Sequence, residues 1–281
     1  MIRVRLLAAA IGLLALSACA GPTSAPVATT APANTSETTV SATPTVSPVD
    51  SHAPPGFVDL SDVDSSIRTD IRYAGSHNFV GRPIAGYLEP RCLLTREAAD
   101  GLARAQRSAT AQGYSLKVYD CYRPSRAGQD FEQWSGTPED SMKAEFYPSL
   151  SKHQLFTDGF VGGGQTTHSS GTAVDLTLVP LHAPSQRPFV PGEPLVACTA
   201  PNRFPDDTVD MGTGYDCFDP RSHTVDPGVT GAARDHRLLL RQIMTDAGFV
   251  NYRNEWWHYD LVNSPHPDTY YDFPVARGAL S

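Results

Sequence analysis

The chain has 281 residues, with 22 Lys and Arg against 30 Asp and Glu, and a formal net charge of −8. Its basic residues form no cluster, which argues against nucleic acid as a partner.

The first residues resemble the signal peptide of a bacterial lipoprotein. Arg3 and Arg5 give a positive start, and the apolar run LLAAAIGLLAL that follows is too short for a transmembrane helix. The sequence LSAC, which ends at Cys19, resembles a lipobox, so we expect residues 1–18 to be removed and Cys19 to be lipidated. The alternative is an ordinary secreted signal with an incidental Cys. Loss of the two arginines leaves 20 basic and 30 acidic residues, a net charge of −10.

Residues 19–53 are predicted to be a disordered tether. They consist mainly of Thr, Ser, Ala, Pro and Val, and contain no aromatic residue, no Lys and no Arg. Such a segment cannot bury enough apolar surface to offset the entropy lost on ordering. We therefore expect an exported protein on the outer face of the cell membrane, attached only through the lipid on Cys19. Residues 54–281 then form one domain.

Four cysteines remain after Cys19, and an even number in an exported chain predicts two disulfides. Sequence alone allows three pairings. We favour Cys92–Cys121 and Cys198–Cys217, because each pair lies within one region of the chain. A Cys-rich zinc site is the alternative, but the chain has no CxxC motif.

The first half of the domain is predicted to contain a helix, a strand and a second helix. Residues 95–111 form the first helix, with Thr95 as its N-cap and Gly113 just beyond its end. Residues 114–122, YSLKVYDCY, alternate as in a strand. A short helix follows at residues 126–135.

The second half is predicted to add two strands and one long helix. GTAVDLTLVPL, residues 171–181, has the β-branched composition of a buried strand, and residues 185–230, rich in Pro, Gly and Asp, form a long loop region. Residues 231–247 are predicted to be helical and residues 249–262 to be a strand. Helices and strands without regular βαβ alternation indicate the α+β class. The apolar stripe of the long helix would consist of Leu238, Leu239 and Ile243.

The stretch THSSGTAVDLTL places a His and an Asp seven residues apart at the start of the predicted strand. His168 and Asp175 could be two ligands of one metal ion, with His258 of EWWH as the third. A catalytic zinc takes three protein ligands and leaves one position for water, and Glu255 could accept a proton from that water. The two Trp between Glu255 and His258 would line the pocket and lower its dielectric constant. The ordinary alternative is a structural His and a loop, but a buried carboxylate needs a partner or a metal ion.

HSSGTAVDLTL resembles the His-x-x-Gly-x-Ala-x-Asp motif of the zinc D-alanyl-D-alanine dipeptidases, the family that includes the vancomycin-resistance dipeptidases. EWWHY resembles the second motif of this family. The similarity covers nearly all of the folded domain, from DIRYAGSHNFVGRPIAGY through VYDCYRP and MGTGYDCFD to YYDFPV. The resemblance implies a single zinc-peptidase domain with a central antiparallel sheet flanked by helices. It also implies a relation to D,D-carboxypeptidase and hedgehog-type folds.

The resemblance implies one Zn²⁺ ion and the residues that work with it. His168, Asp175 and His258 would be the zinc ligands, and Glu255 the general base. Arg123, in YDCYRP, matches the family arginine that stabilises the transition state, because a fixed guanidinium can bind the oxyanion that forms on the carbonyl. Without the family, Arg123 would be read as a turn residue in a surface salt bridge.

Three further residues match substrate-binding positions of the family. Tyr73 and Asp216 match the residues that hold the free ammonium group of the substrate, whereas without the family they would be a core and a loop residue. Thr166 stands where the family usually has Ser, near the substrate carboxylate, and its added methyl group could narrow the pocket. His153 and His223 are expected to be structural or loop residues.

Three functions remain open at this point. The first is hydrolysis of the D-alanyl-D-alanine dipeptide in cell-wall peptide turnover, and the second is a zinc D,D-carboxypeptidase acting on the stem peptides of peptidoglycan. Asp216 favours the free dipeptide, because an acid directed at an ammonium group disfavours a long stem. The third is a zinc-stabilised binding module, which would need neither Glu255 nor Arg123. The resistance dipeptidases deplete a cytoplasmic pool, so export does not support a direct role in resistance.

Overall fold

The computed structural model describes residues 51–280 of the chain. The predicted signal peptide at residues 1–18, the predicted lipidation site at Cys19 and the predicted tether up to residue 50 lie outside the described residues. Ala53 is buried, and its N–H donates a hydrogen bond to the carbonyl of Ala279 at 2.8 Å, so the packed domain includes one residue more than predicted. Among the described residues, no helix combines the length and the apolar character needed to cross a membrane.

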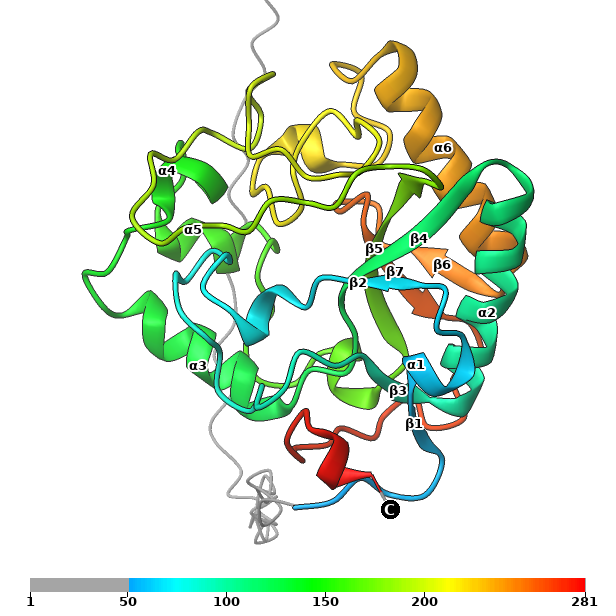
Figure 1. The fold of residues 1–281 in the computed structure, drawn as a ribbon. Coiled ribbons are helices and arrows are strands. Elements are labelled where there is room, and N and C mark those ends of the chain that lie inside the picture. Colours follow the sequence, from blue (N-terminus) through cyan, green and yellow to red (C-terminus); the bar gives the residue numbers. More distant parts are fainter. Residues whose placement is uncertain (1–50, 281) are drawn as a thin grey trace, which may run out of the picture. The chain divides into compact units, whose positions relative to one another are not determined.

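A five-stranded sheet forms the centre of the domain (Figure 1). Three of its four strand pairings are antiparallel, as predicted, but the short strand at one edge is parallel to its neighbour. The sheet is therefore mixed at that edge. In spatial order its strands are β2 (Arg68–Thr69), β4 (Tyr114–Asp120), β5 (Ala173–Pro180), β7 (His258–Leu261) and β6 (Phe249–Asn251).

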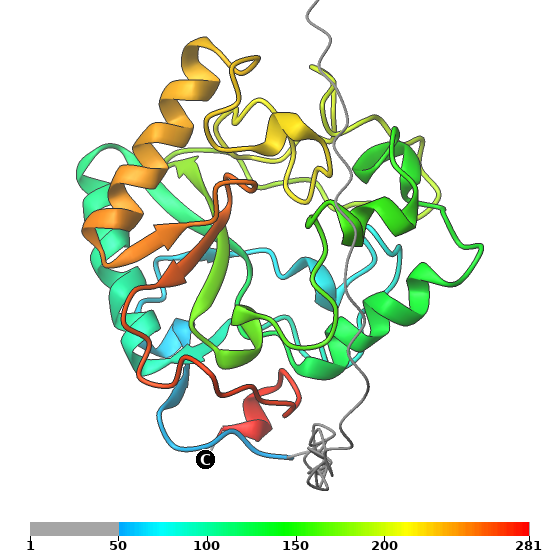
Figure 2. The ribbon, with the colours of Figure 1, turned by 180° about the vertical axis from the view of Figure 1, so that it is seen from behind.

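Two long helices, α2 (Arg96–Ala111) and α6 (Gly231–Asp246), pack side by side against one face of this sheet (Figures 1 and 2). Thr95 is the N-cap of α2, as predicted, and its side chain accepts a hydrogen bond from the N–H of Ala98. Leu238 was expected in the apolar stripe of α6 but is 38% exposed. Leu239 is partly buried, so the buried face of α6 is turned about the helix axis relative to the predicted one. The large apolar side chains that α6 buries are Leu240, Ile243 and Met244.

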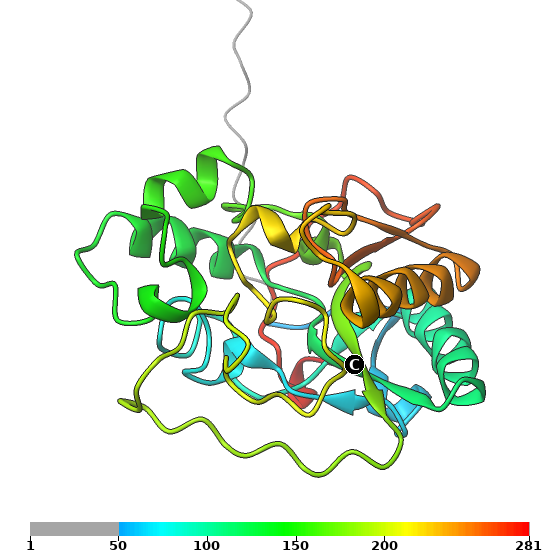
Figure 3. The same cartoon turned by 90° about the horizontal axis from the view of Figure 1, so that it is seen from above.

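Short helices and long loops lie beyond the other face of the sheet (Figure 3). Within residues 185–230 the described structure contains a single element, the 3-10 helix Pro220–Ser222, so the predicted loop region is confirmed. The short helices of this side are α3 (Ser125–Ser135), α4 (Lys143–Phe146) and α5 (Lys152–Thr157).

The prediction of a single strand at residues 249–262 is wrong. The structure has two strands in this range, β6 and β7, with a turn between them. The N–H of Glu255 donates to the carbonyl of Tyr252 at 3.0 Å, and the side-chain amide of Asn251 donates to the carbonyls of Glu255 and His258, both at 3.0 Å. These bonds satisfy the backbone groups of the turn locally. The aromatic run EWWH therefore enters β7 from a turn.

The remaining elements lie near the N-terminal end of the described chain. β4 ends at Asp120 rather than at the predicted residue 122, because Cys121 turns toward Cys92 and forms a disulfide with it. A separate antiparallel pair, β1 (Phe57–Asp59) with β3 (Leu93–Thr95), and a one-turn helix, α1 (Leu60–Val63), complete the strands and α-helices of the described residues. Three further 3-10 helices are Arg72–Ala74, Thr167–Ser170 and Arg277–Ala279.

Candidate active site

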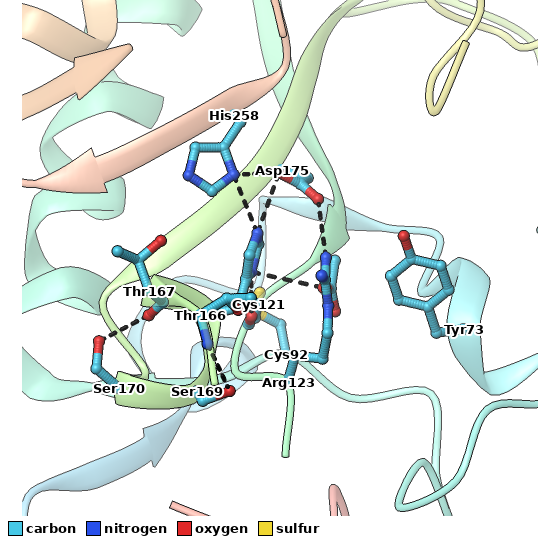
Figure 4. A network of polar contacts seen from close by, with 12 residues as sticks. Tyr73, Cys92, Cys121, Arg123, Thr166, Thr167, Ser169, Ser170, Asp175 and His258 are labelled. Carbon is cyan, nitrogen blue, oxygen red and sulfur yellow. Dashed lines mark hydrogen bonds and ion pairs between the residues drawn. A yellow bond between two sulfur atoms is a disulfide. The ribbon is translucent and has the colours of Figure 1, made fainter. Parts of the chain in front are cut away.

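Three buried side chains converge where β5 and β7 lie side by side (Figure 4). His168 belongs to a 3-10 helix, Thr167–Ser170, that precedes β5, whereas Asp175 and His258 are paired residues of the two strands. Asp175 Oδ1 lies 3.3 Å from His168 Nε2 and 3.1 Å from His258 Nδ1, and the two nitrogens are 3.1 Å apart. The structure thus brings together the three predicted metal ligands, which form the only such group among the described residues.

Each histidine has one ring nitrogen that faces the other metal ligands and one that faces away, and the hydrogen bond of the second nitrogen determines whether the first carries a lone pair. His168 Nδ1 donates to the carbonyl of Cys121 at 2.7 Å, and His258 Nε2 donates to Asp260 Oδ1 at 3.1 Å, so the facing nitrogens carry lone pairs. Two lone pairs and a carboxylate oxygen repel one another unless a positive charge lies between them. A metal ion supplies that charge when both rings are neutral, and in its absence a proton on an imidazole ring supplies it. Ligand atoms about 2.0–2.1 Å from a tetrahedral zinc ion are about 3.3 Å apart, close to the distances in this site. The donor set therefore fits zinc and leaves one coordination position open.

The carboxylate of Asp175 has two further contacts. The hydroxyl of Tyr215 donates to its Oδ2 at 3.1 Å, and the guanidinium of Arg123 lies 3.7 Å from the same oxygen. Burial alone would raise the pKa of Asp175, but the charges of His168 and His258 hold it below its ordinary value. Asp175 is therefore ionised at neutral pH, as a metal ligand requires.

Asp120, at the end of β4, connects Arg123 with the metal ligands. Its Oδ2 accepts a hydrogen bond from Arg123 Nε at 2.9 Å and lies 3.5 Å from His168 Nδ1. The side chain is fully buried, and burial raises the pKa of Asp120. Sequence reasoning missed this residue. The argument applied to Asp175, a carboxylate inside an apolar strand, also holds for Asp120 in KVYDCY and could have found it.

Arg123 is buried in the site, as the resemblance implied, and is no surface residue. Its guanidinium carbon lies 5.0 Å from the centre of the Tyr73 ring, and its backbone N–H donates to the carbonyl of His168 at 3.2 Å. The arginine thus lies between the metal ligands and Tyr73.

Glu255 projects from the turn between β6 and β7 and is 9% exposed. Burial raises the pKa of Glu255 to about 8, and the charge of Asp175 acts in the same direction. A carboxyl group with a pKa near neutrality can accept a proton and return it. Trp256 and Trp257 do not line the cavity, which corrects the expectation. They are buried in the core, where Trp256 Nε1 donates to Thr213 Oγ1 at 2.8 Å.

Asp216 and Tyr73 meet at the other end of the site. The hydroxyl of Tyr73 donates to Asp216 Oδ2 at 2.8 Å. Asp216 is buried with φ of +52°, a left-handed conformation that costs a residue other than Gly about 1–3 kcal/mol. Burial, and then the charge of Asp175, raise the pKa of Asp216 to about 8. The hydrogen bond from Tyr73 and the charge of Arg123 act in the opposite direction and lower this pKa.

One cavity of about 290 Å³ connects these groups. Thr166 contributes to its wall, and the buried Oγ1 of Thr166 has no hydrogen-bond partner in the described part of the chain. His153 and His223 do not line the cavity, in agreement with their predicted structural role. The predicted site residues that line it are Tyr73, Arg123, Thr166, His168, Asp175, Asp216, Glu255 and His258.

Besides Asp120, two supporting residues were missed in the sequence, Asp260 and Tyr215. Asp260 lies two residues after His258 in β7, so both side chains project from the same face of the strand, and that spacing could have indicated the contact. Tyr215 comes from a long loop, and no local pattern indicates its contact with Asp175. The two predicted disulfides, Cys92–Cys121 and Cys198–Cys217, are both present.

A buried His-Asp-His set, a carboxyl group with a raised pKa and a buried arginine around one cavity define a metal-dependent hydrolase. The profile of the D-ala-D-ala dipeptidase family of peptidases matches residues 54–183 and 205–276. The chain belongs to this family.

Curated relatives align over most of their own length. D-alanyl-D-alanine dipeptidase of Enterococcus faecalis is 38% identical over 222 residues, which cover 79% of this chain and 98% of the relative. The enzyme of the same name from Streptomyces coelicolor is 40% identical over 221 residues, with coverages of 78% and 98%. That of Escherichia coli is 33% identical over 205 residues, with coverages of 73% and 84%. A solved structure of the zinc-bound vancomycin resistance D,D-pentapeptidase VanY covers 63% of this chain and 77% of its own at 14% identity, with a TM-score of 0.34, too low to carry an argument.

Proposed function

We propose that this protein hydrolyses D-alanyl-D-alanine to two D-alanine molecules with zinc, in the turnover of cell-wall peptides. The observation that carries the proposal is the single cavity in which the His-Asp-His set, Glu255 and Arg123 lie together with Asp216. A dipeptidase must recognise both ends of a short substrate, and the cavity has a group for each end. The relatives named D-alanyl-D-alanine dipeptidase align with nearly the whole domain.

His168, Asp175 and His258 would hold the zinc ion. When bound, zinc supplies a Lewis acid that polarises the scissile carbonyl and makes water more acidic. The carbonyl of Cys121 and the carboxylate of Asp260 fix the two imidazole rings, so that each presents a lone pair to the metal.

Glu255 moves the proton. Its carboxylate accepts a proton from the attacking water, and the resulting carboxylic acid donates that proton to the amine of the leaving D-alanine. Burial raises the pKa of Glu255 above that of an exposed carboxyl group, which makes its carboxylate a stronger base towards the water molecule.

Arg123 stabilises the charge that develops on the scissile carbonyl. Attack by water converts the carbonyl oxygen to an oxyanion, and the guanidinium lies beside the metal ligands, 3.7 Å from Asp175 Oδ2. Its ion pair with Asp120, at 2.9 Å, fixes the orientation of the guanidinium before substrate binds. No reorganisation of the side chain is then needed during the reaction.

Asp216 and Thr166 recognise the two ends of the substrate. Asp216 binds the free ammonium group, and the Tyr73 hydroxyl holds its carboxylate in place. Thr166 Oγ1, which lacks a partner, offers a hydrogen bond to the substrate carboxylate. The methyl group of this Thr takes up space that the usual Ser would leave, which affects fine specificity rather than the reaction.

The second candidate is a D,D-carboxypeptidase that trims peptidoglycan stem peptides. A stem has an amide where the dipeptide has an ammonium group. An ammonium group stabilises the ionised form of Asp216, which is 4% exposed, whereas an amide supplies no positive charge for it. The cavity of about 290 Å³ is also at the small end of the range for ligand sites. A binding module without catalysis would need neither Glu255 nor Arg123.

The deciding experiment is D-alanine release by the purified, zinc-loaded protein from D-alanyl-D-alanine and from a muramyl pentapeptide, offered separately. Release from the dipeptide alone is the expected result. Release mainly from the pentapeptide would favour the carboxypeptidase, and release from neither substrate, with zinc bound, would favour the binding module. The Glu255→Ala variant is the control for contaminating peptidases.

We also propose that the enzyme acts on the outer face of the membrane, attached through a lipid on Cys19. The lipobox-like LSAC supports this proposal, and so do the two disulfides, because disulfides persist in oxidising compartments outside the cytoplasm. Metabolic labelling with a fatty acid is expected to mark the wild-type protein and not Cys19→Ala. Equal labelling of both would contradict lipidation at this residue.

A further inference from the structure

The triplet Tyr-Asp-Cys occurs twice in the site, at residues 119–121 and 215–217. The rings of Tyr119 and Tyr215 stack with centroids 4.3 Å apart and an interplanar angle of 11°. In each triplet the Asp is buried beside the cavity and the next residue is a disulfide-bonded Cys. The two disulfides are therefore attached to the chain directly after two carboxylates of the site.

We propose that the two disulfides are positioning elements with separate kinetic roles. Cys92–Cys121 positions the groups around the metal, and Cys198–Cys217 positions the carboxylate that binds the substrate ammonium. This inference rests on the proposed dipeptidase function.

At the metal end, Cys121 lies where the chain leaves the sheet. In the described structure, residues 121–124 belong to no strand, and backbone hydrogen bonds hold two of them: Tyr122 N–H donates to the carbonyl of Leu93 at 3.0 Å, and Arg123 N–H to that of His168 at 3.2 Å. The carbonyl of Cys121 accepts the hydrogen bond from His168, Asp120 precedes it and Arg123 follows two residues later. The side chain of Cys121 ties this segment to Cys92, next to β3 (Figure 4). Loss of this disulfide would shift the carbonyl of Cys121, the hydrogen-bond partner of His168, together with Arg123.

At the ammonium end, Cys217 follows the residue with the unfavourable backbone conformation. The disulfide joins it to Cys198, whose N–H donates to the carbonyl of Glu145 at 2.9 Å and whose carbonyl accepts from the N–H of Gly214 at 2.8 Å. A loop without strands is thereby connected to α4. The N–H of Phe218 also donates a hydrogen bond to α4, to the carbonyl of Phe146 at 2.8 Å. Loss of the tie allows Asp216 to leave φ of +52° for a more favourable conformation, which withdraws its carboxylate from the ammonium site.

The test compares two double variants with the native protein: Cys92→Ser with Cys121→Ser, and Cys198→Ser with Cys217→Ser. The first pair is expected to lower kcat and to weaken zinc binding about tenfold each, with KM changed less than about threefold, because supporting groups of metal ligands have effects of this size. The second pair is expected to raise KM about tenfold, with kcat and zinc affinity changed less than about threefold.

Removal of a disulfide can lower the stability of the whole domain as well as displace the site residues, and the test must separate these two effects. All proteins are assayed at a temperature well below their melting points, and Leu240→Ala in α6, a fully buried residue away from the cavity, is the control. It is expected to lower the melting temperature and leave kcat, KM and zinc affinity unchanged. Where a Ser pair does not fold, an Ala-Val pair replaces it, because it leaves no buried hydroxyl without a partner.

The proposal is wrong if both folded pairs keep native kcat, KM and zinc affinity, or if both pairs change the same parameters. Zinc affinity is measured by competition with a chelating dye and needs no substrate. Dipeptide binding is measured by calorimetry in the Glu255→Ala background and needs no turnover. An inactive native protein would therefore contradict the proposed function, while these two affinities still decide the roles of the disulfides.

Discussion

The two ends of the cavity are built from different kinds of structure. At the metal end, Asp175 and His258 are paired residues of neighbouring strands, so the backbone hydrogen bonds of the sheet fix their separation. At the ammonium end, Tyr73 comes from a 3-10 helix and Asp216 from a long loop. Two of the three candidate metal ligands are thus placed on paired strands, whereas Glu255 and Arg123 lie on a turn and a loop, as does Asp216, the residue proposed to bind the substrate. Variants at the two ends are therefore expected to differ in which parameter they change.

Removal of a metal ligand is expected to have the largest effect. His258→Ala leaves two protein ligands, and zinc content is expected to fall from one ion per chain to below detection, with D-alanine release at background. Metal analysis after dialysis measures the first and an amino-acid assay the second. His153→Ala, an exposed histidine in α5, is the matched control and should retain both. Full zinc content in His258→Ala would show that His258 is not a zinc ligand.

Loss of the proton acceptor is expected to separate metal binding from catalysis. Glu255→Ala should keep one zinc ion per chain and the native KM, while kcat falls about 10³-fold, within the range for general acid–base groups. Steady-state kinetics and metal analysis on the same preparation provide the measurement. Native turnover in this variant would refute the mechanism at its central step.

Both ends contain a carboxyl group with a raised pKa, and this shared property predicts how pH affects the metal-free protein. Burial raises the pKa of Glu255 and of Asp216 to about 8, whereas such groups titrate near pH 4 in an unfolded chain. Between about pH 4 and 8 the folded protein therefore holds protons that the unfolded chain has released. Its free energy of unfolding decreases as pH rises, by up to about 1.4 kcal/mol per unit for each group.

Urea unfolding in the presence of a chelator at pH 5, 6 and 7 measures this slope. Glu255→Gln and Asp216→Asn each replace one titrating group by a neutral amide of the same shape, so each variant should show a shallower slope than the native protein. A slope that neither variant changes would mean that other groups carry the pH dependence.

Neutralisation of the ammonium site is expected to act on binding. Asp216→Asn removes the charge that faces the substrate ammonium, and KM for D-alanyl-D-alanine should rise about 100-fold, with kcat changed only a few-fold. Zinc content should stay at one ion per chain. A proportionate gain in activity on the pentapeptide would show that Asp216 also excludes longer substrates. An equal fall in kcat and no change in KM would instead place Asp216 in the chemical step.

The difference between the two ends also explains how much could be predicted from the sequence. His168, Asp175 and His258 lie in compact motifs, and a carboxylate within a β-branched run is unexpected enough to indicate a metal site. The proposed ammonium site depends on a contact between residues 143 positions apart, Tyr73 and Asp216, and only the family resemblance predicted that they act together.

Elements with a regular period were predicted more accurately than the segments between them. α2 and its Thr95 cap were predicted correctly, because the cap, the first turn and the terminal Gly agree with one another. The turn that carries Glu255 was missed, because its aromatic residues resemble a strand and its hydrogen bonds come from the side chain of Asn251.

The smallest effects are expected at Asp260, where substitution tests whether the sheet alone fixes the position of His258. Asp260 accepts a hydrogen bond from His258 Nε2 at 3.1 Å and is only partly buried. Asp260→Asn keeps an acceptor oxygen but loses the charge, so zinc affinity and kcat should each fall about tenfold, with KM unchanged. In Asp260→Ala, zinc affinity and kcat should fall further, because the imidazole of His258 loses its hydrogen-bond acceptor altogether. Native zinc affinity in both variants would mean that strand pairing and packing fix His258 without the carboxylate.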